Sequence, residues 1–133
     1  MKKWSLVIFL SVICLCGCMI QNEEETKLRD VEFTVMDERE IPQELKDNIE
    51  EQKEDVFGIT YGDDGYLYIA KGYGAKETSG YSVEVVQCFE TEHTICLETN
   101  LIGPPKEEEV AETETYPYIV IKTEYSDKFV EFE

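Results

Sequence analysis

The chain has 133 residues, enough for one domain, and a formal net charge of −18 from 30 acidic and 12 basic residues. Such a charge repels phosphate backbones and anionic lipid headgroups, so nucleic acid is not an expected partner. The hydrophobic content of 42% allows a packed core and excludes a chain that is disordered throughout.

Residues 1–17 have the pattern of a lipoprotein signal peptide. Lys2 and Lys3 give a positive start, and the apolar run 4–15 is too short for a comfortable membrane span. The sequence LCGC at 15–18 resembles the lipobox of bacterial lipoproteins, whose last cysteine is acylated and becomes the new N-terminus. We therefore expect fatty acyl chains such as palmitate on Cys18, which would hold the mature chain on the extracytoplasmic side of the cell membrane. The alternative is an ordinary signal peptide with chance cysteines.

Residues 18–30 are acidic, contain little that could pack, and are predicted to be a tether. The folded domain is expected over 31–133. It begins with a strand at 31–35, where apolar and polar residues alternate. A single helix is predicted over 42–54, with Pro42 at its first position and an apolar stripe that packs on the sheet.

From residue 56 onward the sequence indicates strands and turns. Six further strands are predicted, several with alternating apolar residues, and they are separated by turns at 62–65, 90–93 and 126–128 and by the longer loops 72–80 and 102–117. The adjacent Val85 and Val86 interrupt one alternation and predict a bulge. Residues 118–122 are apolar on both faces and predict a central strand. The fold class is therefore mainly β (α+β): a mostly antiparallel sheet or sandwich of about seven strands with one N-terminal helix.

Antiparallel neighbours would bring the loops 72–80 and 102–117 to the same end of the sheet, opposite the three short turns. These loops combine aromatic rings, small residues and prolines, a composition that suits protein recognition. The candidate partner-binding residues are Thr78, Ser79, Gly80, Tyr81, Gly103, Pro104, Tyr116, Pro117 and Tyr118. The alternative for each loop is a set of ordinary turn residues with half-buried tyrosines.

Nucleophilic catalysis is not expected, because the single histidine, His93, falls at a predicted hairpin tip without a nucleophile beside it. Asp63-Asp64-Gly65 lacks the spacing of a calcium loop and is better explained as a turn. We therefore expect no enzyme activity, no metal and no cofactor.

Cys88 and Cys96 flank a hairpin that we expect to be centred on Glu92. This arrangement places the two cysteines opposite each other and makes a cross-strand disulfide geometrically possible. The alternative is a pair of small apolar residues, one or both in the core.

Four segments together resemble the PrcB C-terminal domain family: YLYIAKGYG at 66–74, TSGYSVEV at 78–85, LIGP at 101–104 and YPYIVIK at 116–122. Residues 42–57 resemble the helix that precedes this domain in lipoproteins of the group, so the resemblance extends from Val31 to the C-terminus. The family's usual Thr-Gly-Gly-Tyr is here Thr-Ser-Gly-Tyr, with Ser79 in place of the first glycine.

The resemblance implies a non-catalytic lipoprotein that associates with, or stabilises, a surface protease. The expected partners are thus a protein, in particular a secreted protease, and the membrane through the lipid. The Thr78-Ser79-Gly80-Tyr81 turn is also similar to the loop by which chagasin-like inhibitors enter cysteine-protease clefts. A protease inhibitor and a structural cell-envelope lipoprotein remain as alternatives.

Overall fold

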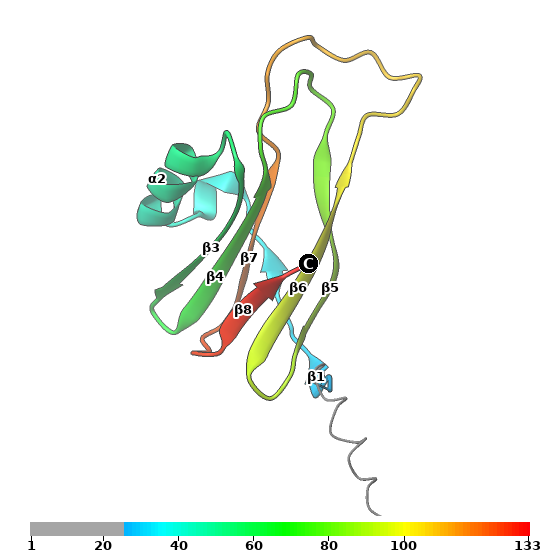
Figure 1. Ribbon diagram of the computed structural model, residues 1–133. Coiled ribbons are helices and arrows are strands. Elements are labelled where there is room, and N and C mark those ends of the chain that lie inside the picture. Colours follow the sequence, from blue (N-terminus) through cyan, green and yellow to red (C-terminus); the bar gives the residue numbers. More distant parts are fainter. Residues whose placement is uncertain (1–25) are drawn as a thin grey trace, which may run out of the picture.

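The alternating segments form two facing sheets of four strands each, with one α-helix on the outer face of the second sheet (Figure 1). The computed structural model describes residues 26–133, so the expected signal peptide and Cys18 lie outside the described residues. Within the described range, every helix is too short or too polar to cross a bilayer. The expected mainly β fold with a single α-helix is confirmed.

The first sheet has the strand order β1-β5-β6-β8 and the second has β2-β7-β4-β3. All neighbours are antiparallel except β6 and β8, which are parallel. The bounds are β1 Arg29–Asp30, β2 Thr34–Val35, β3 Val56–Asp63, β4 Tyr66–Tyr73, β5 Ser82–Glu90, β6 Thr94–Ile102, β7 Tyr118–Glu124 and β8 Phe129–Phe132.

The single strand expected at 31–35 is wrong, because the chain changes sheets there. β1 pairs with β5 in the first sheet, whereas β2 pairs with β7 in the second. Between them Val31 is buried, and its N–H donates to the carbonyl of Cys88 at 2.9 Å. Arg29 and Asp30, which we placed in the tether, are therefore part of a sheet.

The helix α2 spans Gln43–Gln52 and follows a short 3₁₀ helix, η3, at Glu38–Glu40. Leu45 and Ile49 are buried, as their helical spacing predicted, and they belong to an outer core that also contains Tyr68 and Val120. Pro42 is the N-cap residue rather than the first helical residue.

The inner core lies between the two sheets. β4 turns Leu67 and Ile69 inward, and it turns Tyr68 and Ala70 outward toward the helix. β7 does the same with Ile121 and Val120, and it lies between β2 and β4, so the prediction of a central strand at 118–122 is confirmed. Both central strands are thus covered on both faces.

Two local predictions are also confirmed. The turn between β3 and β4 has Asp64 and Gly65 at positive φ (52° and 83°), as a two-residue hairpin requires. The pairing of β5 with β6 shifts between Val85 and Gln87, at the bulge that the adjacent valines predicted.

A hydrogen bond links the two sheets near the ends of their longer strands. The hydroxyls of Tyr73, at the end of β4, and Thr99, in β6, lie 2.5 Å apart and are partly buried. We expect Tyr73→Phe to lower the free energy of unfolding by about 1 kcal/mol, because a typical hydrogen bond contributes that much. Urea denaturation measures the change. The matched control is Tyr125→Phe, at an exposed tyrosine (55%); equal stability of the two variants would contradict this role for Tyr73.

Candidate functional site

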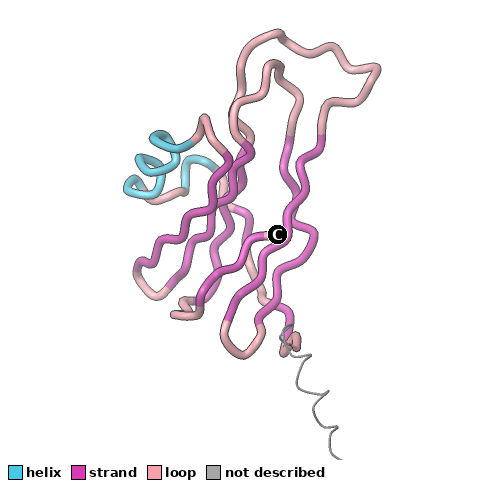
Figure 2. The backbone as a smooth tube through the Cα atoms, in the orientation of Figure 1, coloured by secondary structure: helices cyan, strands magenta, loops and turns pink. Residues whose placement is uncertain are grey.

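Two loops project together beyond the sandwich, at the end away from the three short turns (Figure 2). We call residues 74–81 loop A, residues 103–117 loop B, and the two together the paired loops. Lys76 and Thr115 exchange backbone hydrogen bonds of 2.8 and 2.9 Å, and the N–H of Tyr73 donates to Pro117 at 3.1 Å. The predicted convergence of 72–80 and 102–117 is therefore confirmed.

Thr78 and Ser79 hold the paired loops together. The N–H of Ser79 donates to the carbonyl of Ala111 (3.0 Å), and the N–H of Ala111 donates to the Ser79 hydroxyl (2.9 Å). The Thr115 hydroxyl donates to the carbonyl of Thr78 at 2.7 Å. Ser79 thus contributes a side-chain acceptor that a glycine at this position would lack.

Gly80 and Tyr81 complete the contact. Gly80 has φ +96°, and a Cβ atom there would lie 2.7 Å from Cβ of Pro104. Tyr81 is half-buried, and its ring lies 3.5 Å from where a Cβ on Gly103 would be. We call Gly80, Tyr81, Gly103 and Pro104 the Tyr81 cluster.

Tyr116, Pro117 and Tyr118 form a second group, beside α2. Lys53 follows α2, and its ammonium lies 4.5 Å above the Tyr116 ring, whose hydroxyl donates to Glu114 at 2.9 Å. This hydrogen bond to a carboxylate raises the pKa of Tyr116. Tyr118 packs against the outer core, and burial raises its pKa. The predicted residues therefore divide by their contacts into two groups at the same end of the fold.

Loop B is strongly acidic. It has one lysine, Lys106, and five exposed glutamates: Glu107, Glu108, Glu109, Glu112 and Glu114. None of these glutamates is among the candidate partner-binding residues predicted from the sequence. The run of glutamates at 107–109 is visible in the sequence and could have drawn attention to this segment. Its position beside the Tyr81 cluster becomes clear only from the pairing of the two loops.

The predicted positions of the two cysteines are wrong. Cys88 pairs with Leu97, whereas Cys96 pairs with Phe89, so the two cysteines occupy opposite faces of the β5–β6 hairpin. The hairpin turns at Glu92 and His93 rather than at Glu92 alone, since the N–H of Thr91 donates to the carbonyl of Thr94. Both cysteines are free and buried, which agrees with the alternative of small core residues.

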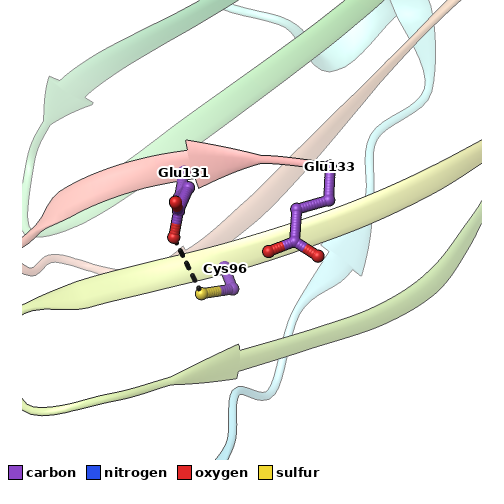
Figure 3. A group of neighbouring side chains, drawn as sticks. All are labelled: Cys96, Glu131 and Glu133. Atoms are coloured by element: carbon purple, nitrogen blue, oxygen red, sulfur yellow. Dashed lines mark hydrogen bonds between the residues drawn. The ribbon is translucent and has the colours of Figure 1, made fainter. Parts of the chain in front are cut away.

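Among the described residues, one group of side chains has atoms close enough together to hold a metal ion: Cys96, Glu131 and Glu133. Their potential ligand atoms lie within 4.8 Å of one another, and Figure 3 shows their arrangement. The Cys96 thiol donates to Glu131 at 3.6 Å, and burial raises its pKa. Metal binding requires a thiolate. The contact is accounted for by a protonated thiol that donates to an exposed carboxylate.

Residues 67–124, less than half of the chain, match the family described as PrcB C-terminal. The matched segment includes both paired loops and leaves out α2, β3 and β8. The comparison with curated proteins gave no match, and neither did the comparison with solved structures.

We expect Gly80→Ala to destabilise the fold by about 2 kcal/mol, because alanine would be strained at this φ and would also press on Pro104. The matched control is Gly65→Ala, which has a similar φ of +83° but open space around the added methyl group. It should lose only about 1 kcal/mol, from strain alone. Thermal and urea denaturation compare the two variants; equal losses would contradict a close contact of Gly80 with Pro104.

We expect Cys88 to resist alkylation in the folded protein at pH 8. Burial, and to a smaller extent the neighbouring Cys96, raises its pKa to about 11, so the reactive thiolate is scarce. The rate of labelling by iodoacetamide, followed by peptide mass spectrometry, should be at least a hundredfold lower at Cys88 in the folded protein than in the chain unfolded by guanidinium chloride. A Cys88–Cys96 disulfide in the same peptide map would contradict the pairing described above.

Proposed function

Residues 67–124 match the PrcB C-terminal family, and from this premise we propose that the chain is a non-catalytic, membrane-anchored lipoprotein that binds a protein partner through the paired loops, as a subunit or stabiliser of a surface protease complex. The observation that carries the proposal is the pairing of the two loops by hydrogen bonds at Lys76–Thr115 and Ser79–Ala111. The matched segment includes all of these residues.

The pairing favours binding because the loops are already ordered. A surface that is held in one conformation loses less conformational entropy when a partner docks. Gly80 and Gly103 are exposed, and Tyr81 is half-buried beside them, so a partner can approach the backbone closely and cover one aromatic ring.

The charge of loop B indicates the chemistry of the partner. Loop B, which contacts the Tyr81 cluster through Gly103 and Pro104, carries five exposed glutamates and one basic residue, Lys106. A basic surface would be attracted to this end of the fold, and it would associate faster at low ionic strength. We therefore expect the partner's docking face to carry lysine or arginine.

The proposed non-catalytic role is consistent with the positions of histidine and cysteine, common bases and nucleophiles, within residues 26–133. The side chain of His93 is 70% exposed at the turn between β5 and β6, and its Nε2 lies 3.9 Å from a carboxylate oxygen of Glu92. This turn is at the end of the fold opposite the paired loops (Figure 1). Cys88 and Cys96 are buried, and the pKa of each is raised. None of these side chains lies in the paired loops.

The orientation of the fold suits an anchored protein. The described chain enters the sandwich at β1, where Arg29 pairs with Glu90 beside the β5–β6 turn, and the paired loops lie at the opposite end (Figure 1). If Cys18 carries the lipid, the loops point away from the membrane surface. They would then meet a partner that lies outside the cell.

The first test is crosslinking of the full lipidated chain in its native membrane, followed by affinity capture and mass spectrometry. We expect a protease in stoichiometric yield, and Tyr81→Ala should reduce its capture about tenfold because a central aromatic anchor is lost. The matched control is Tyr66→Ala, which removes a half-exposed tyrosine from the other end of β4. Unchanged capture by Tyr81→Ala, or recovery of envelope proteins alone, would contradict the proposal.

A protease assay with the captured enzyme then separates a subunit from an inhibitor. Retained or increased activity on adding the purified chain agrees with a subunit or stabiliser. Loss of activity, relieved by Tyr81→Ala, would instead support the alternative of inhibition through the Gly80-Tyr81 turn. The half-buried position of Tyr81 against Gly103 favours the first outcome, because part of the ring is unavailable to a protease cleft.

A further inference from the structure

β3 is the outermost strand of the second sheet, and within residues 26–133 it pairs with β4 alone. Its eight residues contain no lysine, no proline and no bulge, the features that usually protect a sheet edge from another strand. The one charged residue of the strand is Asp63, at its end. β3 therefore offers a long, unprotected edge.

The backbone groups that face outward from this edge can be assigned. The two-residue turn at Asp64 and Gly65 makes Asp63 and Tyr66 a hydrogen-bonded pair, and such pairs alternate with non-hydrogen-bonded ones along an antiparallel ladder. The N–H and C=O groups directed away from β4 are then those of every second residue before Asp63. These residues are Val56, Gly58, Thr60 and Gly62.

A groove of about 990 Å³ runs beside this edge, between β3 and the segment 125–132. Gly58 and Gly62 line the groove and are exposed, and the rings of Phe132 and Tyr125 pack against them where side chains would otherwise lie. Phe129 on the opposite wall is 74% exposed, the largest exposed fraction among the large apolar side chains of the described residues. The groove thus combines a free strand edge with an uncovered aromatic ring.

The charges around the groove are acidic. Asp63, Asp64 and Asp127 line it, are exposed, and form no ion pair within the described part of the chain. The one lysine in the lining, Lys128, is already bound by Glu90 (3.2 Å) and by the carbonyl of Thr91 (2.7 Å). A second copy of this chain would bring the same acidic residues to the edge, and each chain has a formal net charge of −18, so charge disfavours self-pairing.

We propose that the β3 edge is a second docking site, which takes up an extended segment of a partner protein with alternating apolar and basic residues. The segment would add a fifth strand to the second sheet through the outward N–H and C=O groups of Gly58, Thr60 and Gly62. Its apolar side chains would enter the groove beside Phe129, and its basic side chains would be attracted by the acidic turn at Asp63 and Asp64. This site is distinct from the paired loops and does not depend on them.

The test uses the full chain and the peptide acetyl-VKVKVKVK-amide, with binding followed by ¹⁵N chemical-shift perturbation and calorimetry. We expect saturable sub-millimolar binding with the largest shifts at the amides of Gly58, Thr60 and Gly62. Thr60→Pro removes one outward N–H and should weaken binding at least tenfold, while the ladder to β4 is kept because proline is tolerated on an edge. The matched control, Thr60→Val, keeps the N–H and should bind within twofold of the original chain.

Equal binding by Thr60→Pro and Thr60→Val would overturn the proposal, because it would indicate diffuse attraction to an acidic surface. A second comparison does not depend on the folding of the proline variant: peptides N-methylated at all valines or at all lysines. A strand pairs through the N–H groups of alternate residues, so one of the two should lose binding at least tenfold and the other should not. If the chain forms a dimer and Thr60→Pro abolishes it, the edge would be assigned to a second copy of the chain. That result would overturn the proposed occupant.

Discussion

Burial of β4 and β7 on both faces is the constraint on which the rest of the structure depends. Ile69 and Ile121 face the other sheet, whereas Ala70 and Val120 face the side covered by α2, and all four are at most 1% exposed. A strand pair that is apolar on both faces needs a cover on each side. The first sheet supplies one cover and the helix supplies the other. Because loops A and B leave from the same end of β4 and β7, this central pair also places the paired loops side by side.

The sequence predicts most of this fold, and the reason lies in local patterns. The helix was recognised from Leu45 and Ile49 at helical spacing, and the β3–β4 hairpin from an Asp-Gly turn that the backbone adopts. The convergence of the paired loops followed from antiparallel pairing alone. The predictions that were wrong required the register of strand pairing to be known to within one residue. Cys88 and Cys96 lie on opposite faces because the hairpin turns at two residues rather than one, and a shift of one residue moves a side chain to the other face.

The candidate site was predictable in its location but not in the roles of its residues. Thr78 and Ser79 were expected to contact a partner, yet their polar atoms connect loop A to loop B. Tyr116 and Tyr118 were grouped with Tyr81, yet they lie beside α2 and the residue that follows it, Lys53. Such divisions depend on side-chain contacts between segments distant in sequence, for which composition and periodicity carry no information. The strand expected at 31–35 was wrong for the same reason: β1 ends at Asp30 in one sheet, and within 31–35 only Thr34 and Val35 form a strand, in the other sheet.

The crossing at Val31 has a mechanical consequence. Any pull transmitted along the chain from its N-terminal side enters the fold at Leu28, whose N–H donates to Glu90, and at β1, which has only two residues. These few hydrogen bonds would be loaded first. Beyond them the chain passes through the core at Val31 and joins the other sheet at β2, beside the central strand β7. Once β1 has separated, the force is carried by both sheets together, at Val31 and at β2. The short β1 contact can therefore separate under load while the sandwich and its paired loops keep their shape.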